Sequence, residues 1–261
     1  MEPRAVSAGH GWQWIVDGFS LFRKNPVIWI TLILVLYITF TILVRVPVLG
    51  IVIVLLMPVL LAGLMEGCRA LESGQDLKIT HLICGFQKNT AHLVTLGGIS
   101  LVGNLLVLII GAMMTGDAAI TIMKSASGGA ADPAAAEAVL RAAPRVFTGA
   151  LVALTFSLPL LMALWYAPLL VYFENLKPAR SLVVSFGACW KNVLPFLVYG
   201  TVILAGILAL TPISVSLRQF DLSIWLLAPV LIPSIYASYK DIFAPAISPA
   251  ASGGGNNPFL K

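Results

Sequence analysis

The sequence predicts an all-α polytopic membrane protein, and two observations support this fold class. First, 59% of its 261 residues are hydrophobic and only 10% are charged, whereas soluble domains carry about 25% charged residues. Second, several apolar runs reach roughly 18 residues, the length of helix that crosses a hydrocarbon core about 30 Å thick. The net charge of +5 is small and spread along the chain, which favours membrane headgroups over nucleic acid as its counterpart.

We expect six transmembrane helices that pair as three hairpins. Taken in order, the apolar runs cover residues 27–44, 48–65, 93–115, 147–173, 193–215 and 222–239. The links between the first two runs and between the last two are only a few residues long. Such short links place consecutive helices side by side and antiparallel.

The distribution of basic residues predicts the orientation of these helices. With six spans, eleven Lys and Arg residues fall on one side, namely Arg4, Arg23, Lys24, Arg69, Lys78, Lys88, Lys177, Arg180, Lys191, Lys240 and Lys261. Five fall on the other, namely Arg45, Lys124, Arg141, Arg145 and Arg218. Because basic loops stay in the cytoplasm, we expect both termini there. The same side holds all three cysteines, and cytoplasmic thiols normally stay reduced.

Three Lys-Asn pairs, at Lys24, Lys88 and Lys191, each precede an apolar run. The second run of each predicted hairpin also carries a related tetrapeptide, which is MPVL, APLL or APVL. Recurrence of this kind is typical of internal repeats. We interpret residues 1–245 as a single six-helix membrane domain built from three tandem units, approximately 11–75, 76–178 and 179–245. The alternative is three independent uses of ordinary membrane-boundary chemistry.

Each unit is expected to begin with a short amphipathic helix lying flat at the cytoplasmic face of the membrane, which we call a boundary helix. The first lies in the sequence GWQWIVDGFSLFRKN. Its apolar and polar side chains recur at helical spacing on two faces. The apolar set is Trp12, Ile15, Phe19 and Phe22, and the polar set is Gln13, Asp17, Ser20 and Lys24. Tryptophan favours the membrane interface. The alternative is a helix packed on the cytoplasmic loops.

Residues 116–146 form the predicted outer loop. Asp132 followed by Pro133 is a favourable N-cap and first-turn pair. We therefore expect a short helix over residues 134–143, with Pro144 as its stop. The segment has too few polar residues for a solvated domain, so we expect it to rest on the membrane surface. Residues 246–261 are rich in Gly, Pro, Ser and Asn and are expected to form a disordered tail.

Basic residues at the Lys-Asn pairs are candidate contacts for lipid phosphates. Arg23, Lys24, Lys88 and Lys191 are predicted to lie at the depth of the cytoplasmic headgroups, and basic side chains suit phosphate. The alternative is that these side chains only extend towards water. Charged residues at the ends of the second runs could pair with Arg23, Lys88 or Lys191 and join the three units; the candidates are Glu66, Arg69 and Glu174.

Deep ionisable residues mark ion and proton pathways in membrane proteins, and the central thirds of the six runs contain none. Asn104 is the one strongly polar side chain at depth. It is either an intramembrane substrate contact or, as we favour, one partner in an interhelical hydrogen bond. His81 and Cys84 lack the further ligands and spacing of a metal site. No nucleotide-binding or catalytic pattern occurs, so we predict no enzyme activity, no cofactor and no metal.

Three stretches carry a resemblance to a known family. They are GWQWIVDGFSLFRKNP, LLMPVLLAGLMEGCRALESGQ and YASYKDIF. Together they resemble an uncharacterised family of proteobacterial integral membrane proteins, over most of the chain outside the outer loop and the tail. The resemblance implies the bacterial inner membrane and brings no ligand or activity. The hairpin pattern is also similar to the membrane domains attached to some glycerophosphodiester phosphodiesterases, which favours lipid association over solute transport.

The predicted function is that of a non-catalytic inner-membrane component, acting as a scaffold, in envelope maintenance or in association with lipids. The alternative is a small-solute or lipid transporter that uses the proline-broken runs around Asn104. Membrane lipids are the expected partners. Other membrane proteins or a homo-oligomer are further alternatives, and no nucleic acid is expected.

Overall fold

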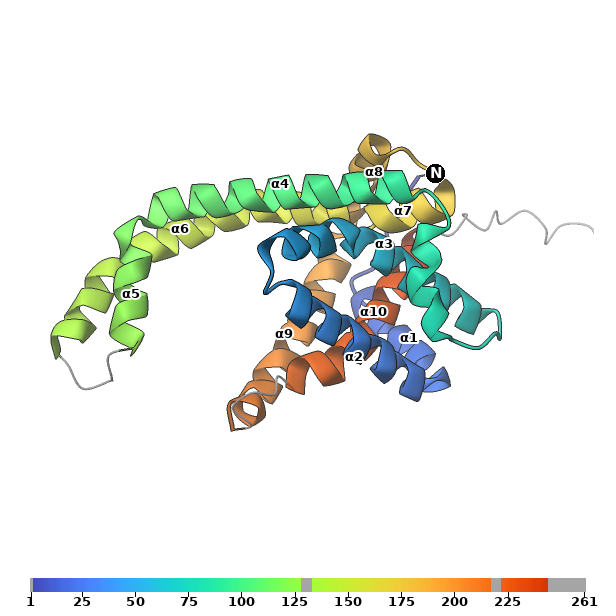
Figure 1. Cartoon of the computed structure of the whole chain (residues 1–261), viewed down its shortest axis with the longest axis horizontal. Helices are drawn as coiled ribbons and strands as arrows, with labels where there is room; N and C mark the ends of the chain where they lie inside the picture. The colour runs from blue at the N-terminus through green and yellow to red at the C-terminus, as the bar shows by residue number, and fades with distance from the viewer. Residues whose placement is uncertain (1, 128–132, 217–221, 244–261) are drawn as a thin grey trace, which may run out of the picture.

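The computed structural model describes residues 2–127, 133–216 and 222–243, and every regular element among them is a helix (Figure 1). The elements are α1 (His10–Lys24), α2 (Pro26–Leu43), α3 (Pro47–Glu72), η1 (Ile79–Phe86), α4 (Thr90–Thr115), α5 (Asp117–Ser127), α6 (Pro133–Trp165), α7 (Ala167–Glu174), α8 (Pro178–Lys191), α9 (Val193–Ser216) and α10 (Leu222–Phe243). The predicted all-α class is confirmed. The expectations for Asp132 and for residues 246–261 concern residues outside the described ranges.

The helices recur in a fixed order along the chain. A short helix precedes two long ones three times: α1 before α2 and α3, η1 before α4 and α6, and α8 before α9 and α10. The three short helices occupy the positions predicted for the boundary helices, and we keep that name for them. Five described stretches are long and apolar enough to cross a membrane: Pro26–Leu43, Pro47–Glu72, Thr90–Thr115, Ala136–Glu174 and Val193–Pro212.

Each boundary helix packs against the second long helix of the preceding group. η1 packs on α3, α8 packs on α6 and α7, and α1 packs on α10. The last of these contacts joins the beginning of the chain to its end, and in Figure 1 the blue α1 lies beside the red α10. The three groups therefore follow one another around a closed arrangement, with each boundary helix as the link between two groups.

Buried prolines mark the same place in each second long helix. Pro58, Pro168 and Pro229, one from each tetrapeptide, are all buried. Just before Pro168 the helix breaks between α6 and α7, where a regular helix would bond the Tyr166 N–H to the Met162 carbonyl. Instead, the N–H donates to the Ser185 hydroxyl (2.9 Å), which donates to the Met162 carbonyl (2.7 Å). A serine of the boundary helix α8 thus satisfies both buried backbone groups.

Close backbone contact explains two glycines of the boundary helices. A Cβ atom on Gly85 of η1 would overlap the Val59 carbonyl oxygen of α3. A Cβ atom on Gly18 of α1 would lie 2.7 Å from the Val230 carbonyl oxygen of α10. Val59 and Val230 each follow the buried proline of their tetrapeptide. The two boundary helices therefore approach equivalent positions of α3 and α10.

Aromatic side chains with paired hydroxyl groups fill the centre of the body. Trp14 lies edge-on to Phe196 and Tyr199, with ring centroids 5.3 and 6.0 Å away. Four buried tyrosines have a hydrogen-bond partner for their hydroxyl group, as burial of this polar group favours. The pairs are Tyr166 with Ser238, Tyr199 with Ser234, Tyr236 with Glu72 and Tyr239 with Glu174. The last two pairs join α10 to the ends of α3 and α7.

The α4–α6 hairpin extends from this body as a long arm (Figure 1). Many of its outward side chains are large and apolar; examples are Val102, Leu105, Leu106, Leu108 and Met113 in α4 and Leu140, Phe147, Leu154, Phe156 and Leu161 in α6. An apolar surface of this extent suits hydrocarbon rather than water. The arm is therefore the part of the fold that most clearly requires a membrane around it.

The expectation of a short helix that ends at Pro144 is wrong. Residues 117–127 form α5, which packs along α6, and α6 runs through Pro144 without ending. The Pro144 side chain is exposed, whereas Ala142 on the same helix is buried. Proline removes one hydrogen bond from a helix, and here the packing of α5 along the other face holds α6 continuous.

Gly18→Ala is expected to destabilise the protein, because the added methyl group would press on the α10 backbone and move α1 away from it. Crowding of this kind costs about 1–3 kcal/mol. Gly187→Ala in α8 is the matched control, since a Cβ atom there meets nothing within 4 Å; it should be neutral or stabilise slightly through its helix propensity. Thermal unfolding in detergent compares the two, and equal Tm values would contradict the α1–α10 contact described here.

Candidate functional site

α1 presents three faces to three different surroundings. Gly11, Trp14 and Gly18 are buried, and α1 packs against α9 and α10. The exposed apolar face consists of Trp12, Val16 and Phe19, and the polar face of Gln13, Asp17, Ser20 and Lys24. Because a helix turns about 100° per residue, the polar face lies between the buried face and the exposed apolar face.

The sequence prediction of two faces is therefore incomplete. Trp12 and Phe19 lie on the exposed apolar face as expected, but Ile15 and Phe22 pack partly against the core. The buried third face was missed because glycine adds nothing to an amphipathic pattern. The signal that was available is the spacing of Gly11 and Gly18, which is seven residues or about two helical turns.

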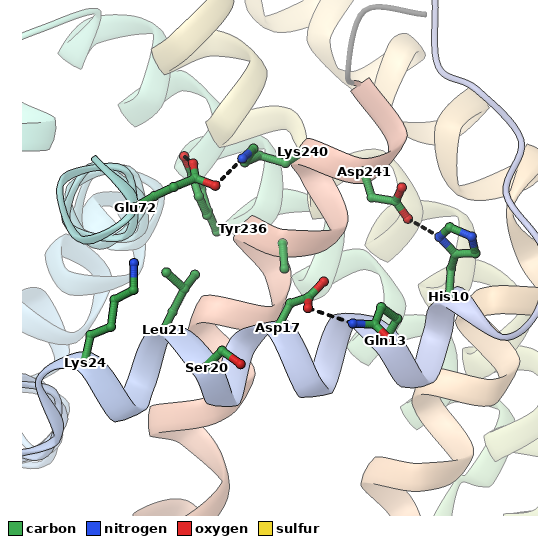
Figure 2. Close-up of a pocket in the computed structure, with 11 residues that line it drawn as sticks. His10, Gln13, Asp17, Ser20, Leu21, Lys24, Glu72, Tyr236, Lys240 and Asp241 are labelled. Carbon is green, nitrogen blue, oxygen red and sulfur yellow. Dashed lines mark hydrogen bonds and ion pairs between the residues drawn. The ribbon is translucent and has the colours of Figure 1, made fainter. Parts of the chain in front are cut away.

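A groove of about 470 Å³ runs between α1 and α10, with Glu72 of α3 at one end (Figure 2). We call it the α1–α10 groove. Its lining residues are His10, Gln13, Asp17, Ser20, Leu21 and Lys24 of α1, Glu72 of α3, and Tyr236, Ala237, Lys240 and Asp241 of α10. Most of them are polar and both signs of charge are present. The groove lies at the end of α10, next to the exposed apolar face of α1.

Ion pairs and hydrogen bonds already occupy several charged groups of the groove. Lys240 pairs with Glu72, which also accepts a hydrogen bond from the Tyr236 hydroxyl (3.0 Å). Asp241 accepts hydrogen bonds from Nδ1 of His10 (2.7 Å) and Nε1 of Trp14 (2.9 Å). These bonds tie α10 to the end of α3 on one side and to α1 on the other.

Asp241 is also the acceptor for Arg4, whose guanidinium pairs with its carboxylate. Partial burial would by itself raise the pKa of Asp241, but the hydrogen bonds from Trp14, His10 and Arg4 outweigh this effect. The pKa of this carboxyl therefore lies below its usual range. Asp241 is accordingly ionised at neutral pH and holds three donors around it.

The N-terminal segment is tied to the same end of α10. The Arg4 N–H donates to the Ile242 carbonyl (3.0 Å). The fully buried Asn192 holds the segment at two further points: its Oδ1 accepts from the Val6 N–H (2.8 Å), and its Nδ2 donates to the Arg4 carbonyl (3.0 Å). Residues 4–6 are thus fixed by backbone hydrogen bonds in addition to the Arg4–Asp241 ion pair.

The asparagines of the other two Lys-Asn pairs have different partners. Asn25 caps α2, because its Oδ1 accepts from the Ile28 N–H (3.4 Å). Asn89 has a left-handed backbone, with φ 55°, and its Nδ2 donates to the Val171 carbonyl (2.8 Å) and to Oδ1 of Asn175 (2.9 Å). The asparagine side chain therefore secures the turn into the following long helix in two different ways.

The four candidate phosphate-contacting residues lie at separate places. Lys24 lines the α1–α10 groove, where its Nζ donates to the Leu71 carbonyl (2.8 Å). The charged groups of Arg23 and Lys88 lie 5.9 and 5.8 Å from the centroids of aromatic rings. Lys191 is exposed in the last turn of α8. Contact with lipid phosphate stays a prediction for all four.

The suggested pairing of Glu66, Arg69 and Glu174 with basic residues of other units is wrong. Glu66 pairs with Arg69, one turn further along α3, and Glu174 accepts from the Tyr239 hydroxyl (3.0 Å). An arginine three residues away on the same helix is a favourable partner for a glutamate. The contacts between units come instead from α10, through the Lys240–Glu72 ion pair and the hydroxyls of Tyr236 and Tyr239.

The expected interhelical hydrogen bond of Asn104 is also wrong. Its Nδ2 donates to the Ser100 carbonyl (2.7 Å) and lies 3.2 Å from the Ser100 hydroxyl, and the side chain is exposed. A polar side chain that faces away from other helices finds its nearest acceptor one turn back in its own helix. As for metal, the described residues contain no group of three or more His, Cys, Asp or Glu placed to hold an ion.

Most of the groove lining could not be predicted from the sequence, because only Gln13, Asp17, Ser20 and Lys24 belong to the predicted polar face. Tyr236 and Lys240 are spaced four residues apart, so they lie on one face of α10. That spacing was a usable signal, but it gave no indication that the face lies against α1. Glu72 carried no signal, because its role depends on the position of the last turn of α3 beside α10.

The chain is similar in sequence to a known protein over nearly its whole length. The chain is 30% identical over 259 residues to a protein of Burkholderia thailandensis named a probable inner membrane protein, and the match covers 93% of this chain and 94% of the relative. No family model matches the chain, and no solved structure matches it. The comparisons give no link to membrane domains of glycerophosphodiester phosphodiesterases.

Acidification is expected to release the N-terminal segment. Because the pKa of Asp241 is lowered in the folded protein, its bonds stabilise the docked segment above the ordinary carboxyl pKa of about 4 and are lost as the pH falls through the lowered value. At neutral pH, Asp241→Asn should speed hydrogen exchange at the Arg4 and Val6 amides by about tenfold, as expected from losing charged hydrogen bonds. The exposed Asp76→Asn is the control. Unchanged exchange in Asp241→Asn would contradict this account.

Proposed function

The chain belongs to the family of the Burkholderia thailandensis probable inner membrane protein, and on that premise we propose that it is a multi-pass inner-membrane protein acting without catalysis as a lipid-associated scaffold. The observation that carries the proposal is the exposed apolar face of α1. Trp12, Val16 and Phe19 stay exposed although Trp14 and Gly18 fix the opposite side of the same helix in the core. An anchored helix with exposed aromatic side chains is suited to lie in the membrane interface.

An even number of spans is supported by the position of the two ends of the described chain. Arg4 pairs with Asp241 and α1 packs on α10, so these ends lie together. Five stretches are long and apolar enough to cross the membrane. Five crossings would leave the two ends on opposite sides. α10, which is apolar over residues 222–239, therefore serves as the sixth span.

A cytoplasmic position for this end is supported by its basic residues. Arg4 and Lys240 form ion pairs with residues of α10 and α3, Lys24 bonds to the end of α3, and Arg69 and Lys88 lie over aromatic rings of α7. These contacts gather five basic residues around the same helix ends. Basic residues concentrate on the cytoplasmic side of membrane proteins, so we place both termini there.

Transport around Asn104 receives less support than a scaffold. The Asn104 side chain bonds to its own helix and faces outward, whereas a transport site is expected between helices near the middle of the membrane. The α1–α10 groove lies at the end of α10 instead, beside an interfacial helix. Its position favours contact with headgroups over passage of a solute.

The double substitution Trp12→Ser and Phe19→Ser is expected to reduce lipid association while the fold is kept, because both side chains are exposed and Trp14 remains in the core. Deleting α1 would be a poor test, since that would also remove its buried face. The measurement is lipid phosphorus per protein after purification in mild detergent. Leu140→Ser, at an exposed position of α6, is the control. Equal lipid retention in the double variant and the wild type would count against the proposal.

A further inference from the structure

Two opposite charges of the α1–α10 groove have no ionic partner in the described part of the chain. Asp17 accepts a hydrogen bond from the Gln13 amide (2.8 Å), and Lys24 donates to the Leu71 carbonyl (2.8 Å). The other acidic and basic groups of the groove form ion pairs, namely Lys240 with Glu72 and Asp241 with Arg4 and His10. An unpaired carboxylate and an unpaired ammonium on one surface suit a ligand that carries both charges.

The helix sets the spacing of these two residues. Asp17 and Lys24 are seven residues apart on the polar face, which is about two turns or roughly 10.5 Å along the helix axis. Figure 2 shows both side chains rising from α1 towards the groove. A short ligand with a cation at one end and an anion at the other can therefore approach both residues from the groove. A phosphate ester and an ammonium joined by two carbon atoms form such a ligand.

We propose that the α1–α10 groove binds a phosphoethanolamine group, with its phosphate at Lys24 and its ammonium at Asp17. This inference rests on the proposed lipid association and names the headgroup involved. Ser20 lies between the two charged residues on the same face; its hydroxyl donates to the Val16 carbonyl (3.0 Å) and keeps its lone pairs free to accept from the ammonium. Asp17 and Ser20 thus offer acceptors to the ammonium, and Lys24 offers a cation to the phosphate at the end of the groove where Glu72 is already paired with Lys240.

The source of the phosphoethanolamine group is a membrane phospholipid, as the surroundings of the groove indicate. The polar face of α1 adjoins the exposed apolar face, so the groove opens where headgroups would lie if Trp12 and Phe19 face the acyl chains. A choline headgroup carries the same charges, but its methylated ammonium cannot donate a hydrogen bond to Asp17. A glycerol headgroup has no ammonium. Ethanolamine should therefore bind in preference to both.

The test uses the purified full-length protein and native mass spectrometry with phosphatidylethanolamine, phosphatidylcholine and phosphatidylglycerol of identical acyl chains. We expect several-fold preference for phosphatidylethanolamine in the wild type. Asp17→Asn should reduce its binding by about tenfold, the effect expected when a charged hydrogen bond is lost, and Lys24→Gln should also weaken it. Lys78→Gln and Asp76→Asn each remove one charge from an exposed position outside the groove; neither should change the preference.

A second arm titrates soluble phosphoethanolamine against the lipid-depleted protein. Binding of this compound without any preference for the ethanolamine lipid would support the groove and overturn the lipid as its source. If neither form is preferred while lipids of all three classes remain bound, this inference fails and the proposed function stands. If no lipid is retained at all, both fail. Should Lys24→Gln not fold, Asp17→Asn still tests the inference, because the Asp17 side chain is exposed and its replacement should leave the fold intact.

Discussion

The packing of α1 on α10 brings the start of the described chain to its end, and the other features of this end of the fold depend on it. Gly18 allows the two backbones to approach, and Trp14 fills the space beside them while donating to Asp241. Once α1 is in place, its polar face forms one wall of the groove and its exposed apolar face points away from the body. The groove, the docked N-terminal segment and the exposed apolar face are therefore consequences of one helix contact.

In the low-dielectric interior of a membrane, backbone N–H and C=O groups freed by a helix break have no water to bond. The fold provides other partners or close packing at these places. Ser185 bridges the break before Pro168, and the two other boundary helices press glycines against equivalent positions of α3 and α10. Asn89 and Asn192 use their amides on carbonyl groups of distant segments. Small and amide-bearing residues at the boundary helices thus serve both close packing and hydrogen bonding.

The sequence was sufficient for the long apolar helices and the boundary helices and for their order, since length, apolarity and the recurring Lys-Asn pairs are local signals. It was insufficient where the outcome depends on contacts between distant segments. Pro144 was expected to stop a helix, but packing by α5 decides otherwise. Asn104 was expected to bond across helices, yet its side chain faces outward. In the groove, the polar face of α1 was predicted, whereas Tyr236, Lys240 and Glu72 could not be assigned to it before α10 was placed beside α1.

The three boundary helices should all lie on one side of the membrane, as a threefold recurrence of a short helix and two spans requires. Labelling of single cysteines at Lys24, Lys88 and Lys191, with Cys68, Cys84 and Cys189 replaced by alanine, tests it most directly. A membrane-impermeant maleimide should label all three positions in inverted vesicles and none in right-side-out vesicles. Labelling of any one of them from the opposite side would contradict both the orientation and the recurrence.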